Sequence, residues 1–568
     1  MRDQLYSQEA PYSLMEPDFA HRTRMKWYNH FGEAFLIVAA DGIFMHICSA
    51  EGHHYMTSRR EQFPKWVYIY NILQIFGQNV ISAEGIEWRH HRKIMAGSFN
   101  EENAALVFKE SIRQAQGMLS KWTGPDQSTD VKLPNLAEDS MKLALHIIGY
   151  VGFGQRMLWP GQTMPEGTDA KIAKFGSLDA PKGFTTSFVD ALTLVLENIF
   201  FVLCLPSWLM RALPIDRTKK TADAADDYFH YINDMLDERT EAAEKSQKGG
   251  KDDIEGMDLM GSLVRASRGK KGLTRDEIVG NTFVLQLAGH ETTANTIQFT
   301  MLYLACYPAA QRKIQEELDA MFAGSDPDTW DHYQHTNLLL ASTLGAAMYE
   351  TLRLIPPVPE IPKTTLEDQP LVMDGVEYIV PKGTVISVGA AAAQINPRYW
   401  PTEPSKRREG EDDLLDFVPD RWYRPSRDEF SDDEKSGVDS DELSKDKAGP
   451  TTAAALYRPI RGSYLPFSDG SRSCMGRRFA QTEVVAALAV IYREYSVELA
   501  VDDLAGDAEV ERMTTEERTK VYHEARDRCL TTLDGARTVL SLRLVNGEKV
   551  PVRLRKRGQE QFVDRVKY

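Results

Sequence analysis

The sequence Phe467-Ser-Asp-Gly-Ser-Arg-Ser-Cys-Met-Gly476 places one cysteine, Cys474, in a loop of small and polar residues. Gly470 and Gly476 would allow backbone conformations and close approaches that a Cβ atom blocks. An apolar helical pattern follows Gly476, which predicts that Cys474 lies at the N-terminal end of a helix. Such an end carries partial positive charge and free N–H groups, which lower the pKa of a thiol and favour the thiolate that binds metals.

The same loop matches the spacing F-x-x-G-x-R-x-C-x-G at all five fixed positions, including Phe467, Arg472 and Gly476. Roughly one window in three million would match by chance, and a chain of 568 residues offers far fewer windows than that. The spacing is the haem-binding signature of the cytochrome P-450 family, which the chain resembles. The resemblance implies that Cys474 ligates the iron of haem b, where a thiolate favours O–O cleavage. The alternative is an inert buried cysteine in a glycine-rich turn.

The clearest single helix is expected from Thr274 to Cys306. Thr274 and Glu277 form a capping box, the interior is apolar nearly all round, and Pro308 follows the end. At 1.5 Å per residue, the helix would be about 50 Å long. A helix this long and apolar should cross the middle of a large helical domain.

This helix contains Ala288-Gly-His-Glu-Thr-Thr293, which resembles the family's central-helix motif [A/G]-G-x-[D/E]-T. Gly289 would let the helix open locally beside the iron. The resemblance implies that Glu291 and Thr292 relay protons to dioxygen, because O–O cleavage needs protons delivered through an apolar pocket. The alternative for Thr292 is a hydrogen bond to a carbonyl of its own helix. His290 is interpreted as structural.

Glu350-Thr-Leu-Arg353 puts two opposite charges on one helical face. An E-x-x-R pair is a weak motif by itself. The pair resembles the family's buried ion network, which also includes an arginine further along the chain, here Arg421. This network is expected to stabilise the core on the thiolate side of the haem. Loss of one partner would leave a buried charge unpaired.

Further residues are expected at the haem propionates. Trp88-Arg-His-His-Arg92 resembles the family's W-x-x-x-R helix, whose Trp88 and Arg92 side chains would face one propionate. Arg472 of the cysteine loop would pair with a propionate as well. Lys363 falls where many relatives carry an arginine for the other propionate, and this departure leaves its role less secure.

A basic cluster stands out in a chain with a formal net charge of −16. The overall acidity argues against a nucleic-acid-binding protein. By resemblance, the cluster would lie on the thiolate side of the haem and dock an acidic electron donor, although ordinary solvated charge is the alternative. Its members are Arg89, His90, His91, Arg92, Lys93, Arg477 and Arg478.

No membrane anchor is expected in residues 1–30, which lack an apolar run of the required length. The most apolar window, Ala191 to Met210, is interrupted by Glu197, Asn198 and Pro206, so a membrane-dipping or core-lining segment is favoured over a span. The five cysteines form no C-x-x-C pair, which fits a reducing intracellular environment.

The remaining pattern predicts one haem domain over residues 31–556, between an extension (1–30) and a tail (557–568). Asp41-Gly42 should join a hairpin over 35–48, and helices should dominate from about 100 to 315. The acidic segment 426–447 is expected to be disordered or a solvated loop. Short strands are expected at residues 369–380, 384–388, 536–545 and 549–554.

Together these features predict a mainly α fold with a small β region and a long central helix over a buried haem. The resemblance implies insertion of one oxygen atom from O2 into an apolar small molecule. Electrons would come from NADPH through a separate NADPH-cytochrome P-450 reductase, with cytochrome b5 as a further candidate donor. The resemblance also suggests a location at the cytosolic face of the endoplasmic reticulum membrane. Likeness to filamentous-fungal members suggests a role in secondary metabolism. The alternatives are a haem-thiolate isomerase or dehydratase, and a non-catalytic haem-binding protein.

Overall fold

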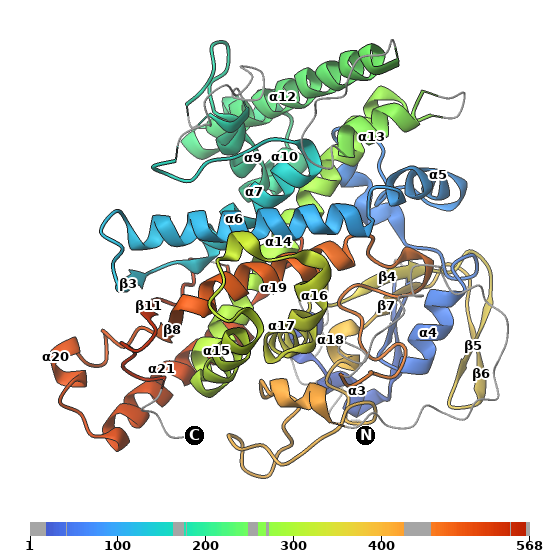
Figure 1. The fold of residues 1–568 in the computed structure, drawn as a ribbon. Coiled ribbons are helices and arrows are strands. Elements are labelled where there is room, and N and C mark those ends of the chain that lie inside the picture. The colour runs from blue at the N-terminus through green and yellow to red at the C-terminus, as the bar shows by residue number, and fades with distance from the viewer. Residues whose placement is uncertain are drawn as a thin grey trace.

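A long helix, α14 (Arg275–Cys306), crosses the middle of the molecule (Figure 1). Thr274 caps it through the predicted capping box with Glu277, and between Ile278 and Cys306 nearly every residue is buried. The computed structural model describes residues 19–40, 42–162, 175–177, 179–247, 259–268, 272–424, 456–545 and 547–563.

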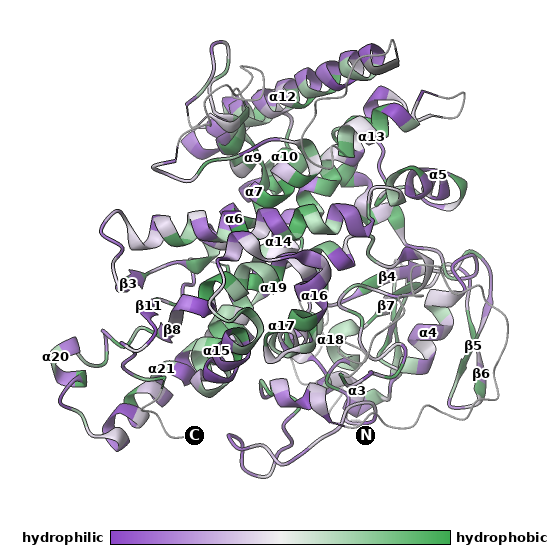
Figure 2. Ribbon diagram, in the orientation of Figure 1, coloured by the Kyte–Doolittle hydropathy of each residue, from purple (hydrophilic) through white to green (hydrophobic). Residues whose placement is uncertain are grey.

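Helices α7 (Leu136–Phe153) and α19 (Arg477–Glu494) pack against this central helix, and α6 (Glu101–Thr123) packs against both of them. Their apolar faces meet in the main core, and the hydropathy colouring is correspondingly green along α14 and α19 (Figure 2). Burial of this shared apolar surface is the principal force that holds the helical part together.

The other helices surround this centre. On the side of α12 in Figure 1 lie α9 (Phe188–Glu197), α10 (Ile199–Cys204), α11 (Ser207–Ala212), α12 (Asp216–Gln247) and α13 (Leu259–Ala266). Elsewhere lie α2 (Phe19–Thr23), α3 (Lys26–Phe31), α4 (Ala50–Ser58), α5 (Gly85–Ala96), α15 (Pro308–Phe322), α16 (His332–Ala341), α17 (Thr343–Leu354), α18 (Ala390–Ala393), α20 (Asp507–Val510) and α21 (Thr515–Asp534). The 3-10 turns are η1 (Val67–Gln74), η2 (Pro327–Thr329), η3 (Pro419–Tyr423) and η6 (Gly470–Arg472).

The β region is small, as expected. Its four-stranded sheet has the order β1-β2-β7-β4, with β1 (Ala34–Ala39), β2 (Gly42–Ile47), β7 (Val385–Val388) and β4 (Ile361–Thr364). The predicted hairpin is confirmed: β1 and β2 are antiparallel, and Ala39 pairs with Gly42. The other sheets contain β5 (Gln369–Met373) with β6 (Val376–Val380), β3 (Asp130–Leu133) with β11 (Val552–Lys556) and β8 (Tyr495–Leu499), and β9 (Arg537–Thr538) with β10 (Leu542–Arg543).

The packed domain extends beyond both expected boundaries. Phe19 and Tyr28, in the segment expected to be an extension, are buried against the first sheet and its surroundings. At the other end Phe562 is buried against Tyr522, and its backbone N–H donates to the Glu498 carboxylate. The acidic segment 426–447 lies outside the described residues.

The apolar window 191–210 forms parts of three short helices rather than one. Helix α9 ends at Glu197, and Pro206 separates α10 from α11, because proline lacks the N–H that a continuing helix needs. Among the described residues, none of the helices combines the length and apolarity needed to cross a bilayer.

Candidate functional site

The cysteine loop has a tightly hydrogen-bonded backbone. The Cys474 N–H donates to the Phe467 carbonyl over 2.8 Å, and the Ser473 N–H donates to the Gly470 carbonyl over 3.0 Å. Gly470 has a φ of +67°, and a Cβ there would lie 2.2 Å from the Thr57 carbonyl oxygen. Glycine is therefore required at position 470, as expected.

The second motif glycine behaves differently. Gly476 has a φ of −85°, and a Cβ atom built there would approach no protein atom closer than 3.8 Å. The protein itself therefore places no steric demand for glycine at position 476. The Gly476 backbone N–H instead hydrogen-bonds to the Cys474 thiol.

Cys474 lies just before α19, as predicted. Its side chain lies inside the protein, and part of its surface can still be reached by solvent. Burial raises the pKa of the thiol, while the Gly476 N–H and the positive charges of Arg477 and Arg92 act to lower it. The helix end thus acts in the expected direction, although desolvation outweighs it in the protein alone.

One stripe of α14 is accessible within an otherwise buried stretch. Between Ile278 and Cys306, the only residues that are not buried are Leu285, Ala288, Gly289 and Thr292. Their spacing of three and four residues puts them on one helical face. Leu285 packs against the same apolar cluster as Met475, the neighbour of Cys474. The stripe and the cysteine loop therefore border the same apolar cluster.

Helix α14 is continuous through Gly289, so the predicted local opening is not observed. The Thr292 hydroxyl donates to the Ala288 carbonyl over 2.8 Å, which is the back-bonded geometry considered as the alternative. That bond leaves the hydroxyl oxygen free to accept a further hydrogen bond, because a hydroxyl has one proton and two lone pairs. Its position on the accessible stripe is compatible with a role in proton transfer.

Glu291 is buried beside the strand pair β9–β10. Burial raises the pKa of its carboxyl, and Arg543 and hydrogen bonds from Ser541 oppose that rise. The raised pKa favours a carboxyl that retains its proton. His290 is also buried, and desolvation lowers the pKa of its imidazole to about 4, so it is neutral, and its structural role stays a prediction.

Three residues expected at the haem propionates come together across the sequence. The Arg472 guanidinium lies 4.3 Å from the centre of the Trp88 ring, and that of Arg92 lies 5.8 Å from it. Arg92 also donates to the Ser473 carbonyl over 3.0 Å, which ties α5 to the cysteine loop. Arg472 forms an ion pair with Glu84 over 2.7 Å.

Lys363 of β4 is buried close to this group, and its ammonium donates to the Phe63 carbonyl over 2.9 Å. Sequence reasoning missed two neighbours. Lys65 is the cross-strand partner of Lys363, and its ammonium lies 3.5 Å from the centre of the Tyr70 ring. No motif marks Lys65 or Tyr70, and Lys65 meets Lys363 only in the folded chain.

The E-x-x-R network is fully buried. Both Glu350 oxygens accept from Arg353, over 2.7 and 2.8 Å, and one also accepts from Arg421 over 3.2 Å. The Trp422 indole N–H donates to the other oxygen. Burial would raise the pKa of Glu350, but the two arginines outweigh it, and the net direction is downward.

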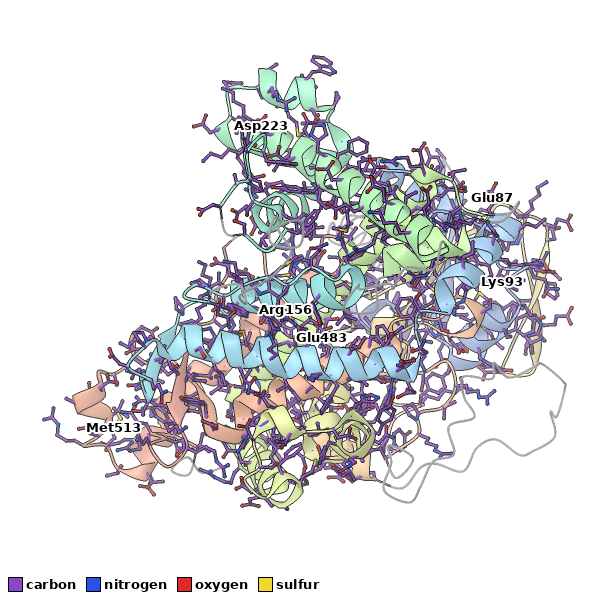
Figure 3. The ribbon with its side chains drawn as sticks, turned by 45° about the horizontal axis from the view of Figure 1, so that its top comes forward. Glu87, Lys93, Arg156, Asp223, Glu483 and Met513 are labelled. Carbon is purple, nitrogen blue, oxygen red and sulfur yellow. The ribbon has the colours of Figure 1, made fainter. Side chains whose placement is uncertain are left out.

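The basic cluster divides into buried and surface members. His91 is buried, where its Nδ1 hydrogen-bonds with Asn281 and its Nε2 lies 3.4 Å from Glu277, so it belongs to the contact between α5 and α14. Lys93, on the outer surface of α5, is exposed (Figure 3). Arg89 is exposed as well.

These features can be tested against haem b. An accessible thiol that protein surrounds can serve as an axial ligand. The accessible stripe on α14 provides an apolar face with one hydroxyl, Thr292, and the cations around Trp88 are suited to two carboxylates. The residues present fit the group.

Comparison with known proteins gives a consistent result. The cytochrome P-450 family model matches residues 20–509. A cytochrome P-450 monooxygenase of Arthrobotrys oligospora is 28% identical over 95% of this chain and 87% of its own length, and cytochrome P-450 monooxygenase 124 of Postia placenta is 31% identical over 80% and 75%.

A third relative, the phomenoic acid biosynthesis cluster cytochrome P-450 monooxygenase of Leptosphaeria maculans, is 24% identical over 75% of this chain and 69% of its own. A crystal structure of a cytochrome P-450 superposes with a TM-score of 0.61 at 18% identity, covering 94% of this chain and 97% of that one, and confirms the predicted fold. The chain therefore belongs to the cytochrome P-450 family and is a haem b-dependent monooxygenase.

Proposed function

We propose that Cys474 is the axial thiolate ligand of the haem iron and that the enzyme inserts one oxygen atom from O2 into an apolar organic substrate. The observation that carries this assignment is an accessible cysteine, within the protein interior, at the start of α19. When bound, haem b supplies the activation of dioxygen and the transfer of one oxygen atom. The protein positions the cofactor and substrate and delivers protons.

Proton delivery is assigned to Glu291 and Thr292. The raised pKa of Glu291 keeps a proton available within a mostly apolar helix. The Thr292 hydroxyl stands on the accessible stripe and can accept a proton on one side as it donates on the other. An isomerase or dehydratase would not need this pair, so its presence supports the monooxygenase reaction.

An apolar substrate is supported by the aromatic groups next to the stripe. Phe283 of α14 contacts Phe76 and Tyr228, with ring centres 4.7 and 6.2 Å apart. Together with the α9 side chain Phe188, they form part of an apolar cluster that also includes Leu285. The rings of Phe283, Tyr228 and Phe188 are themselves fully buried, so the apolar surface open to a substrate is that of the stripe, and its burial would be the main source of substrate affinity.

Electrons are proposed to arrive from NADPH-cytochrome P-450 reductase, with cytochrome b5 as a second donor. The exposed side chains of Arg89, Lys93 and Arg477 lie on α5 and at the start of α19, the elements that flank the cysteine loop. Exposed cations on an acidic protein would steer an acidic partner toward this face.

Contact with a membrane is proposed for the segment 191–210. Phe200 on α10 is 51% exposed and Trp208 on α11 is 70% exposed, and Tyr68 of the neighbouring η1 is 73% exposed. Aromatic side chains of this kind favour the interfacial region of a bilayer. The proposed location is the cytosolic face of the endoplasmic reticulum membrane, and the Leptosphaeria relative's name supports a role in secondary metabolism.

The first experiment is the absorption spectrum of the purified, reduced protein exposed to carbon monoxide. The wild type should show the red-shifted Soret band of a thiolate-ligated complex, and Cys474→Ala should lose it. Cys204→Ala, at the other exposed cysteine, is the matched control and should keep the band. A histidine-type spectrum in the wild type would contradict the assignment of Cys474. Absence of NADPH-dependent turnover with a reductase would instead favour a non-catalytic haem protein.

A further inference from the structure

The accessible face of α14 ends at Asn281. This residue precedes Leu285, Ala288 and Thr292 by four, seven and eleven positions, so its side chain points from the same helical face as the stripe. Asn281 is fully buried, because the loop at residues 77–83 and helix α5 both bond to its side chain. The contacts of Asn281 therefore fix where this face of α14 lies.

The Asn281 amide is hydrogen-bonded through both its oxygen and its nitrogen. Its Oδ1 accepts from the Val80 N–H over 2.9 Å, and its Nδ2 donates to the Glu277 carbonyl over 2.7 Å. These two contacts fix the orientation of the amide, since a backbone N–H cannot accept and a carbonyl cannot donate. In the 2.8 Å contact between Nδ2 and His91 Nδ1, the ring nitrogen is therefore the acceptor.

The accepting role of Nδ1 places the proton of the His91 ring on Nε2. That nitrogen lies 3.4 Å from one oxygen of the Glu277 carboxylate, and the other oxygen accepts from the Thr274 N–H at the start of α14. A proton on Nδ1 would point at the Asn281 N–H and break the bond between the two side chains. His91 thus has one defined tautomer and contacts the first turns of α14 through both ring nitrogens.

The Val80 peptide group connects Asn281 to the cysteine loop. Its N–H donates to Asn281, and its carbonyl accepts from Arg472 over 3.4 Å. Arg472 also donates to the Ala83 carbonyl over 2.8 Å. One peptide group thus links the accessible face of α14 to the residue two positions before Cys474.

Helix α5 provides a second link between the same two parts. His91 bonds to Asn281, and the next residue, Arg92, donates to the Ser473 carbonyl over 3.0 Å. Neighbouring residues of a helix have a constant separation, so α5 holds the α14 face and the residue before Cys474 at a defined distance from each other.

We infer that His91 and Asn281 are positioning residues, which set the place of the α14 stripe relative to Cys474 and the cofactor. The inference rests on the proposed function, and it adds two residues that act through others rather than on the reacting atoms. Their effect reaches Thr292 because the stripe belongs to one continuous helix. Enzyme rates can fall about 100-fold for a misplacement of about 1 Å that originates far from the chemistry, so a small shift of α14 matters.

Carbon monoxide is the probe in the test, because it binds reduced haem opposite the thiolate and its C–O stretching frequency responds to nearby polar groups. The carboxamide oxygen of His91→Asn can replace Nδ1 as the acceptor from Asn281. His91→Gln instead extends to the position of Nε2 and removes that acceptor. In infrared spectra, the C–O band of His91→Asn should match that of the wild type, whereas the band of His91→Gln should shift or split by more than its width.

His332→Gln is the matched control. His332 is also buried, and its two ring nitrogens hydrogen-bond with Glu101 of α6 and Thr336 of α16. Its C–O band should be unchanged. Identical bands for His91→Asn and His91→Gln, in samples that keep the thiolate-type Soret band, would overturn the inference alone. Loss of that Soret band in the wild type would refute the proposed function and the inference with it.

A second measurement needs no variant, in case His91→Gln fails to fold. Val80 lies outside the helices, yet in the wild-type holoenzyme its N–H should exchange with solvent as slowly as the amides inside α5. The reason is that it donates to Asn281 in a buried position. Mass spectrometry with residue-level fragmentation measures this exchange. Exchange at the rate of an exposed loop amide would show that Asn281 does not hold the loop, and the inference would fail.

Discussion

At the scale of single residues, the sequence motif treats Gly470 and Gly476 alike, but the structure separates them. Gly470 adopts a left-handed conformation against the Thr57 carbonyl, whereas Gly476 has an ordinary backbone angle and open space toward the protein. A motif records which residue types recur and gives no physical reason for each. The reason for Gly470 is steric, and that for Gly476 lies outside the protein's own packing.

This difference is testable by thermal unfolding. Gly470→Ala should destabilise the protein by more than about 2 kcal/mol, because it combines a strained φ with a Cβ 2.2 Å from a carbonyl oxygen. Gly476→Ala in the haem-free protein should change the free energy of unfolding by less than about 1 kcal/mol. Equal losses for both variants would contradict a steric need for glycine at position 470 alone.

Thr292 is the second residue whose role can be separated from its packing. Thr292→Ala should retain haem and NADPH consumption, but product formed per NADPH should fall at least roughly tenfold as peroxide is released. The matched control is Thr300→Ala, since Thr300 makes the same back-bond within α14, to Thr296, but is fully buried. Unchanged coupling in Thr292→Ala would remove Thr292 from the proton relay.

At the scale of elements, local sequence signals predict a helix correctly where capping residues define its ends. The capping box of Thr274 and Glu277 predicted the start of α14 correctly. Helix α21 was not predicted, although Thr514 and Glu517 form a capping box of the same kind. Its mean hydropathy is low and its buried face includes Arg518, so the apolar periodicity is weak.

The short helices α10 and α11 carry the prediction for membrane contact. Trp208→Ser should weaken binding to phosphatidylcholine vesicles about tenfold, because a large aromatic side chain would no longer be buried in the interface. Tyr333→Ser, at a residue that is 64% exposed on α16, should leave vesicle binding unchanged. Equal binding by the wild type and Trp208→Ser in a sedimentation assay would exclude this segment as the contact.

At the scale of the whole molecule, the buried ion network connects parts of the chain that are distant in sequence. Glu350 receives hydrogen bonds from Arg353 on its own helix, and from Arg421 and Trp422 of η3. Arg421 continues the network to Asp413. Arg421 meets its partners Glu350 and Asp413 only in the complete fold.

Loss of one partner should therefore be severe. Glu350→Gln should destabilise the protein by about 3 kcal/mol or more, because it leaves Arg353 and Arg421 buried without their shared carboxylate. Glu524→Gln, which removes an exposed partner of Arg528, is the control and should cost less than about 1 kcal/mol. Denaturant unfolding would measure both, and similar costs would contradict a structural role for the network.

Glu350 also predicts how the stability of the protein depends on pH. The pKa of Glu350 is lowered in the folded state, so its contribution to stability is complete above the unfolded value of about 4.3. That contribution is lost as pH falls through the lower folded value. The stability of Glu350→Gln should accordingly change less with pH between about 5 and 3 than that of the wild type. Parallel curves would show that Glu350 is not ionised in the fold.

The sequence by itself determined the family, the cysteine loop, the long capped helix and the mainly α architecture. These features depend on residues close together along the chain, where spacing and capping chemistry act directly. Only the tertiary structure decided that burial raises the pKa of Cys474, that α14 stays closed at Gly289, and that Lys65 faces Lys363. Desolvation and charge pairing depend on which distant segments meet, and that information is absent from any local pattern.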